Sequence, residues 1–83
     1  MRNITIYRYI LEVVRAGSVR KAAERLAITP SSLNRRIQSF EQEMGGPIFE
    51  KNAQGVRLNA AGELAVHAFK KHLAEIELSL IHI

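Results

Sequence analysis

Residues 22–37 read AAERLAITPSSLNRRI, and this stretch decides the fold. Two segments of helical character meet across a connection of only a few residues. The first segment carries the small residues Ala22 and Ala23, which allow a neighbouring helix to cross closely. In the second segment Thr29 can cap a helix that has Pro30 at its first position, where the missing amide hydrogen costs nothing. We therefore predict two helices joined by a tight turn, the second with a polar and basic start.

The apolar residues along the first half of the chain repeat every three or four positions, as on the buried face of a helix. On a first helix, which we expect to stop at Gly17, the buried stripe comprises Ile6, Tyr7, Ile10, Leu11, Val13 and Val14. On a second helix, capped by Ser18, the inner face comprises Val19, Ala22, Ala23 and Leu26. On a third helix, which Gly45 and Gly46 end, the core stripe comprises Leu33, Ile37, Phe40 and Met44. These stripes can cover one another.

Beyond the third helix the pattern changes. Two short apolar runs, residues 47–49 and 56–58, flank a polar loop of residues 50–55 and predict a small β-hairpin. Asn59 can cap a last helix from Ala60 onward, and the one domain boundary that we expect lies there, between residues 1–58 and 59–83. The apolar residues of this last helix advance at heptad spacing, which suits a partner helix. The predicted dimerisation residues are Val66, Phe69, Leu73 and Ile76.

Composition excludes several classes of protein. At 83 residues, with 47% hydrophobic residues, the chain has room for one small ordered domain and perhaps one extra element, but not for a large enzyme core. It contains no Cys and no Asp, and no Gly-rich phosphate loop, so we expect no enzyme activity and no cofactor. The three histidines, His67, His72 and His82, lack ligand spacing on one helix face, so no metal site is expected. Without an apolar run of about 20 residues or a signal peptide, we expect a cytoplasmic protein that does not bind membranes.

Charge is distributed unevenly along the chain, whose formal net charge is +4. Residues 37–50 contain glutamates and no base. Residues 15–36 contain one acid, Glu24, against the bases Arg15, Arg20, Lys21, Arg25, Arg35 and Arg36. Such a block attracts a polyanion, although charge alone leaves an ordinary solvated helical surface equally open.

Two helices joined by a tight turn, the second exposing short polar and basic side chains, form a helix-turn-helix. The start of the second helix enters the major groove of double-stranded DNA, and its free amide groups favour a phosphate. The residues expected to contact bases or phosphates are Ser18, Arg20, Lys21, Thr29, Pro30, Ser31, Ser32, Asn34, Arg35, Arg36 and Gln38. Lys51 and Arg57 flank the predicted hairpin and are expected to touch the sugar-phosphate backbone, with plain surface charge as the alternative for both.

From about Ile6 to Glu63, in one register, the chain resembles the N-terminal DNA-binding domain of LysR-type transcriptional regulators. The residues that carry this resemblance are Ser18 to Leu26, Leu33, Ile37, Phe40, Glu41, Gly45, Pro47 to Lys51 and Arg57 to Gly62. The resemblance implies a mainly α, winged helix-turn-helix fold of three helices and a β-hairpin wing, followed by a long linker and dimerisation helix. It also implies a homodimer that binds a palindromic promoter site, and a separate C-terminal domain that senses a small-molecule effector.

The chain departs from the family pattern at the start of the third helix. Thr29 and Pro30 stand where the family usually has Ser and Gln, and Asn34 stands where it has a second Ser. Pro30 has no hydrogen-bond donor, so the base contact that the Gln often supplies is absent. Lys51 replaces a common Arg, which keeps the charge but loses the bidentate fork.

Two further hypotheses concern the rest of the chain. Residues 78–83 (LSLIHI) are what the DNA string CTG-TCT-CTT-ATA-CAC-ATC encodes, and this string resembles a transposon end used in sequencing-library preparation. We hypothesise that the natural reading frame was cut there and that a sensor domain follows in the intact gene. The alternative function is a helical interaction or dimerisation module without DNA binding, a module that would not need the basic block.

Overall fold

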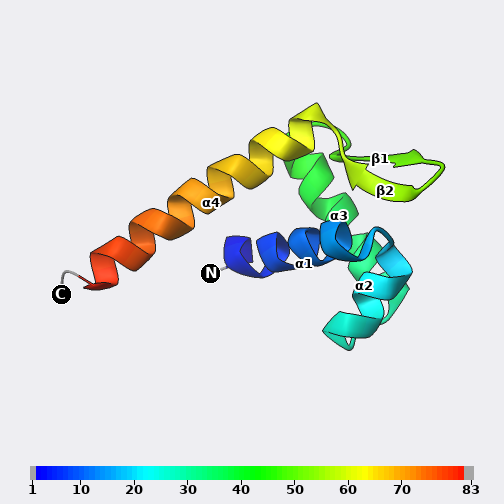
Figure 1. Cartoon of the computed structure of the whole chain (residues 1–83), viewed down its shortest axis with the longest axis horizontal. Helices are drawn as coiled ribbons and strands as arrows, with labels where there is room; N and C mark the ends of the chain where they lie inside the picture. The colour runs from blue at the N-terminus through cyan, green and yellow to red at the C-terminus, as the bar shows by residue number, and fades with distance from the viewer. Residues whose placement is uncertain (1, 82–83) are drawn as a thin grey trace.

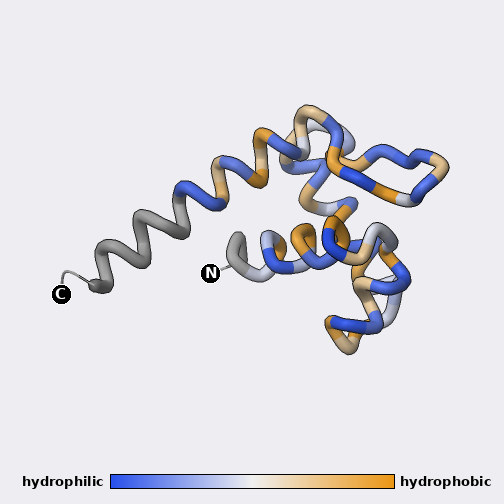
Figure 2. The backbone as a smooth tube through the Cα atoms, in the orientation of Figure 1, coloured by the Kyte–Doolittle hydropathy of each residue, from blue (hydrophilic) through white to orange (hydrophobic). Residues whose placement is uncertain are grey.

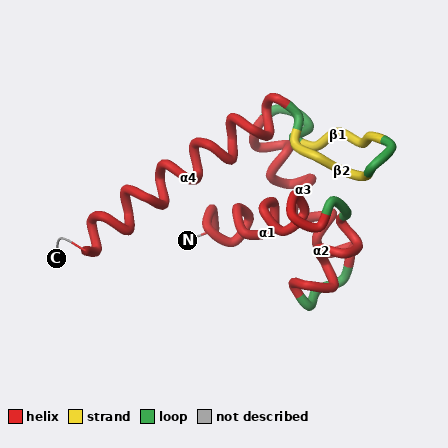
Figure 3. Tube along the Cα trace, viewed as in Figure 1, coloured by secondary structure: helices red, strands yellow, loops and turns green. Residues whose placement is uncertain are grey.

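The computed structural model describes the backbone of residues 2–81 and the side chains of residues 5–71. The elements, in chain order, are α1 (Arg2–Ala16), α2 (Val19–Leu26), α3 (Pro30–Met44), β1 (Phe49–Asn52), β2 (Gly55–Leu58) and α4 (Ala60–Ile81). Helices α1 to α3 gather in one group, the hairpin projects from one end of it, and α4 runs away in the opposite direction (Figures 1 and 3). The predicted mainly α, winged helix-turn-helix with a long last helix is thereby confirmed.

Both helices of the helix-turn-helix begin at the predicted caps, α2 after Ser18 and α3 after Thr29. The Ser18 hydroxyl accepts a hydrogen bond from the backbone N–H of Lys21 at 3.2 Å, at the start of α2. The Thr29 hydroxyl accepts one from the backbone N–H of Ser32 at 3.1 Å, and Pro30 is the first residue of α3. Each cap satisfies one of the amide groups that a helix start leaves without an intrahelical partner.

The tight turn between α2 and α3 contains a residue in the left-handed region. Ala27 ends α2 with φ 58° and ψ 39°. Its N–H donates to the carbonyl of Glu24 at 3.2 Å, and the N–H of Ile28 donates to the carbonyl of Ala23 at 3.1 Å. This is the bonding of a helix end that glycine usually occupies, because a Cβ makes the left-handed conformation unfavourable by about 1 kcal/mol. The corner is therefore fixed by backbone bonds despite the cost of the alanine.

The core consists of two clusters that α1 joins. The first lies where α1, α2 and α3 meet, and its buried members are Val13, Ala22, Ala23, Leu33 and Ile37. The second lies between α1, α3, the start of the hairpin and α4, and its buried members are Tyr7, Ile10, Phe40, Ile48, Ala65 and Val66. Along α1 and α3 apolar and hydrophilic residues alternate within each turn, as amphipathic helices require (Figure 2). The inward faces of α2 and α3 thus fix which face of α3 remains outside.

Two predicted core residues are exposed. Met44 retains 53% of its accessible surface because it is the last residue of α3, beyond the turn that packs through Phe40. Val14 retains 38%, since it lies about 100° round α1 from the fully buried Val13. The apolar spacing in the sequence therefore included one residue beyond the packed part of α3, Met44, and one residue beside the buried stripe of α1, Val14.

The hairpin is longer and its turn is tighter than the sequence indicated. The strands pair antiparallel, with Phe49 opposite Leu58 and Asn52 opposite Gly55, so residues 50–52 of the predicted polar loop belong to β1. Only Ala53 and Gln54 remain between the strands. Polar residues form these strands because much of each strand faces solvent, whereas Phe49 and Leu58 reach the core.

The hairpin is attached to the corner between α1 and α2. The N–H of Val56 donates to the carbonyl of Gly17 at 3.0 Å. Gly55, with φ 136°, comes so close that a Cβ built there would lie 2.5 Å from the same Gly17 oxygen. A side chain at this position would therefore be excluded both by its backbone conformation and by the approach of Gly17.

Asn59 secures the junction between the hairpin and α4. Its side-chain carbonyl accepts the N–H of Gly62 at 2.8 Å, and its side-chain amide donates to the carbonyl of Pro47 at 2.9 Å. Its backbone N–H donates to the carbonyl of Ile48 at 3.0 Å, and the N–H of Ile48 donates to the Glu41 carboxylate at 2.9 Å. The predicted cap at Asn59 is confirmed, and it also holds the segment that leads into β1.

Helix α4 contributes its first part to the core of its own chain. Val66 is 7% exposed within the second cluster. The ring of Phe69 lies 5.2 Å from that of Tyr7 and 5.7 Å from that of Phe40, centroid to centroid. These residues were predicted to face a second chain. In the structure they pack on α1 and α3 of their own chain, and their pairing with a second chain stays a prediction. The side chains of Leu73 and Ile76, the other predicted members, lie outside the described residues.

Candidate nucleic-acid interface

The outward face of α3 carries the polar residues predicted to read DNA. Since Leu33, Ile37 and Phe40 turn inward, the residues on the opposite side of the helix face solvent. Exposed residues in and just before the first three turns are Thr29, Pro30, Ser31, Asn34, Arg35, Arg36 and Gln38, whereas Ser32 is half-buried. Among the described side chains, those of Asn34 and Gln38 have no hydrogen bond within the chain and are available to a ligand.

The adjacent arginines of α3 differ in their surroundings. The guanidinium carbon of Arg36 lies 5.5 Å from the centre of the Tyr9 ring on α1, which is cation–π distance. Asn34 and Arg36 point about 160° apart around the α3 axis, because each residue advances about 100°. Arg35 lies between these directions on the outward side. The sequence predicted both arginines as DNA contacts without deciding which of the two faces outward; the structure gives Arg35 the more outward position.

A groove of about 420 Å³ runs beside the stacked arginine, between α1 and α3. Its lining mixes apolar, basic and acidic side chains: Thr5, Ile6, Tyr9, Arg35, Arg36, Ser39, Phe40 and Glu43. The groove thus lies beside the polar face of α3, on the side that faces α1.

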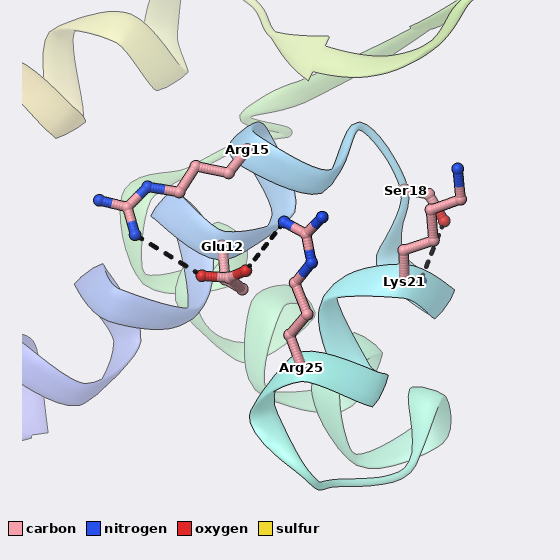
Figure 4. Close-up of polar contacts among 5 residues, drawn as sticks. All are labelled: Glu12, Arg15, Ser18, Lys21 and Arg25. Carbon is pink, nitrogen blue, oxygen red and sulfur yellow. Dashed lines mark hydrogen bonds and ion pairs between the residues drawn. The ribbon is translucent and has the colours of Figure 1, made fainter.

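The start of α2 presents a second polar surface. Arg20 and Lys21 are exposed, whereas Ser18 is half-buried and its hydroxyl is occupied by the cap to Lys21 (Figure 4). Amide groups at a helix start carry partial positive charge, which adds to that of the basic side chains. The phosphate contact predicted for this end of α2 stays a prediction, and the Ser18 oxygen already accepts the cap bond from Lys21.

Glu12, which sequence reasoning did not single out, pairs with part of the basic block. Its carboxylate lies 3.3 Å from the Arg25 guanidinium and 3.7 Å from that of Arg15, and its side chain is 17% exposed (Figure 4). The contact links α1 to the last turn of α2. Glu12 and Arg25 lie on different helices and far apart in the sequence, so the sequence pattern did not indicate that they form a pair. Part of the positive charge of residues 15–36 is thereby balanced within the chain.

The hairpin carries the remaining predicted residues. Lys51 on β1 and Arg57 on β2 are both exposed. The Nε–H of Arg57 donates to the carboxylate of Glu50 at 2.8 Å, and the two residues lie directly opposite in the strand register. Glu50 was also missed, because the sequence placed it in a loop, where no partner could be assigned. The hairpin thus offers an arginine paired with Glu50 and a lysine that forms no ion pair with any described side chain.

Neither a metal centre nor a membrane-spanning helix is found among the described residues. Among residues with described side chains, no group of three or more His, Asp or Glu is arranged to hold a metal ion. No helix within the described chain has the length and apolar character needed to cross a membrane. The described surface does carry exposed hydrogen-bonding and basic side chains on α2, α3 and the hairpin.

Comparison with known proteins identifies the family. Residues 4–63 match the family model described as "Bacterial regulatory helix-turn-helix protein, lysR family". The chain is 36% identical over 72 residues to the HTH-type transcriptional regulator TfdT of Cupriavidus pinatubonensis, covering 87% of this chain and 32% of TfdT. It is 35% identical over 74 residues to ClcR of Pseudomonas putida, covering 89% of this chain and 25% of ClcR. The chain therefore spans about a third or less of the length of these relatives.

Solved structures agree with the sequence comparison. The crystal structure of a CbnR DNA-binding domain in complex with DNA aligns with a TM-score of 0.77 and 26% identity, over 94% of this chain and 90% of that one. The BenM DNA-binding domain in complex with benA site 1 DNA aligns with a TM-score of 0.77 and 28% identity, over 94% of this chain and 88% of that one. The match of fold and sequence over the helix-turn-helix and the wing leads to one conclusion: this chain belongs to the LysR family of bacterial regulatory helix-turn-helix proteins.

Proposed function

We propose that this chain is the DNA-binding part of a LysR-type transcriptional regulator and that it binds double-stranded DNA in a sequence-specific manner. The observation that carries the proposal is the outward face of α3, whose start exposes Asn34, Arg35 and Gln38 with no partner among the described side chains. A helix of this kind fits the major groove, where such side chains can bond base edges and phosphates. The likeness to DNA complexes of CbnR and BenM supports it.

Each surface has a distinct part in the proposed complex. Asn34 and Gln38 read base edges, Arg35 reaches a guanine or a phosphate, and the start of α2 holds a phosphate through its amides, Arg20 and Lys21. Lys51 and Arg57 place the wing on the sugar-phosphate backbone. Arg36 acts mainly through its stack on Tyr9 and contributes less to DNA binding than Arg35.

The rest of the proposal concerns the assembly. Residues 1–58 form the DNA-binding unit and residues 59–83 the linker helix, whose far part pairs with a second copy at heptad spacing. A two-fold pair would present two α3 helices to a palindromic site about 34 Å apart. A small molecule would act only through a further domain, and no catalytic activity is proposed. Like other regulators of bacterial promoters, the protein would work in the cytoplasm. The competing function is a dimerisation module that does not bind DNA.

A titration with fluorescently labelled duplexes tests the proposal. Binding sites are first selected from a randomised duplex library, and affinity is then measured from 50 to 200 mM salt. We expect affinity to fall steeply with salt, with a slope near 0.9 per phosphate neutralised. Arg35→Ala should weaken binding to all duplexes and reduce the slope by about 1. Asn34→Ala should mainly relax selection at one base pair, by about 1–3 kcal/mol.

Lys70→Ala is the matched control, since Lys70 is an exposed base on α4, away from the interface. It removes the same charge as Arg35→Ala. Equal effects of the two substitutions, or wild-type binding that does not respond to salt, would favour the interaction module. Equal losses of Asn34→Ala on selected and random duplexes would refute base reading by Asn34.

A further inference from the structure

The wing contains an acid, Glu50, directly opposite its arginine, Arg57. In the strand register Glu50 faces Arg57, and the Arg57 Nε–H donates to Glu50 at 2.8 Å. The side chains are 69% exposed for Arg57 and 46% for Glu50, so both are accessible from solvent. Lys51, the neighbour of Glu50, is in no ion pair among the described residues. The acid is therefore specific to one of the two bases of the wing.

We propose that Glu50 competes with DNA phosphates for Arg57 and so lowers the affinity of the wing for DNA of any sequence. The inference rests on the proposed function. It makes Glu50 a specificity-determining residue that does not contact a base. Because the wing then adds less sequence-independent affinity, a larger share of the binding free energy comes from contacts of α3 with base edges.

The geometry explains how the competition works. An arginine grips a phosphate or carboxylate with two parallel N–H bonds, commonly through Nε and one terminal nitrogen. Glu50 occupies the Nε position, so a phosphate that approaches on that side must displace it. A phosphate bound only at the terminal nitrogens would meet an arginine whose charge Glu50 has already balanced. In the first case the contact costs the free energy of breaking the pair, and in the second DNA gains less than one full positive charge from Arg57.

The ion pair of Glu50 and Arg57 is weak enough to lower the affinity for DNA without blocking DNA binding. Ion pairs between exposed side chains are weak, so DNA can open the pair at a modest cost. A cost of 1 kcal/mol corresponds to a factor of about five in affinity. Glu50 therefore reduces DNA binding by up to about fivefold without preventing it.

The experiment uses Glu50→Gln, which keeps the size and hydrogen-bonding ability of the side chain and removes its charge. Affinity for a 20-base-pair duplex of random sequence is measured between 50 and 200 mM salt, with circular dichroism melting to verify folding. We expect tighter binding at low salt, by up to about fivefold, and a salt slope steeper by up to about 0.9 because one more phosphate is neutralised. Glu63→Gln is the control: Glu63 is exposed on α4 and is in no ion pair within the described part.

A second pair of variants isolates the role of Arg57. Glu50→Gln is compared in the Arg57→Ala background, where no arginine remains to compete for, and it should change affinity no more than Glu63→Gln. Tighter binding that persists in this background would mean that Glu50 acts by repelling DNA, and the inference would be overturned. Weaker or unchanged binding of Glu50→Gln alone would overturn it too.

These outcomes are separate from failure of the proposed function. If Arg35→Ala weakens binding and Glu50→Gln does not strengthen it, only the competition is wrong. If wild-type protein does not bind duplex DNA, both proposals are wrong.

Discussion

Asn59 should be among the residues that stabilise this domain most for their size, because its side chain makes two bonds with different tasks. Its carbonyl caps α4 at the N–H of Gly62, and its amide holds the carbonyl of Pro47 before β1. Asn59→Ala removes both bonds. Asn59→Thr retains an oxygen that can cap the helix and removes only the bond to Pro47.

The magnitudes follow from these bonds. Loss of a helix cap costs about 1 kcal/mol, and loss of an intramolecular hydrogen bond costs about 1 kcal/mol. The bond to Pro47 is exposed, so water can replace it and its loss lies at the low end. We expect Asn59→Ala to lower the free energy of unfolding by about 2 kcal/mol and Asn59→Thr by less than about 1 kcal/mol. At about 4–8 °C per kcal/mol, Asn59→Ala should lower the melting temperature by roughly 10 °C.

Thermal unfolding followed by circular dichroism, at one fixed protein concentration, gives the comparison. Asn34→Ala is the control, since it deletes the same atoms from an exposed asparagine with no hydrogen bond among the described side chains. Its melting temperature should stay within about 2 °C of wild type, in keeping with the small effects of most surface substitutions. Equal destabilisation by Asn59→Ala and Asn59→Thr would refute the capping role, and equal melting of Asn59→Ala and Asn34→Ala would refute both bonds.

Two other predictions follow from the turn and from α4. Ala27→Gly should stabilise the fold by about 0.5 kcal/mol in urea unfolding, because relief of the left-handed strain exceeds the added entropy of the unfolded chain; a destabilised variant would contradict this. Phe69→Ala should lower the free energy of unfolding of the single chain by at least about 2 kcal/mol, since its ring packs on Tyr7 and Phe40. Leu73→Glu should leave folding intact and shift sedimentation towards monomer at high concentration. A Leu73→Glu variant that dimerises like wild type would exclude the proposed pairing.

The sequence was most informative where local chemistry determines structure. Ser18, Thr29 and Asn59 mark helix starts because their side chains can accept amide hydrogens from the next turn, a property that depends on neighbours along the chain. Gly17 and Gly45 mark helix ends for a similar reason. Each of these boundaries is confirmed, and together they define the helix-turn-helix and the start of α4.

Features that depend on distant neighbours were harder to predict. Phe69 has the spacing of a coiled-coil seam and equally that of an ordinary core helix, and only the position of Tyr7 and Phe40 decides between them. Glu12 pairs with Arg25 because α1 and α2 are in contact. Glu50 pairs with Arg57 because β1 continues past the apolar residues that predicted it and includes Glu50. The contact roles assigned to individual DNA-facing residues remain predictions, because they depend on a partner as well as on the fold.

The bond between Val56 and Gly17 has a consequence for the length of the DNA that one domain can cover. It fastens the wing to the corner where α2 begins, so the wing cannot swing like a flexible arm. The distance between the wing tip and the exposed start of α3 is then set by the protein. A DNA site on which both surfaces bind at once must have a fixed number of base pairs between the two contacted segments. Insertion of a single base pair there would turn one segment by about 34° and move it by about 3.4 Å, so that only one of the two surfaces could engage.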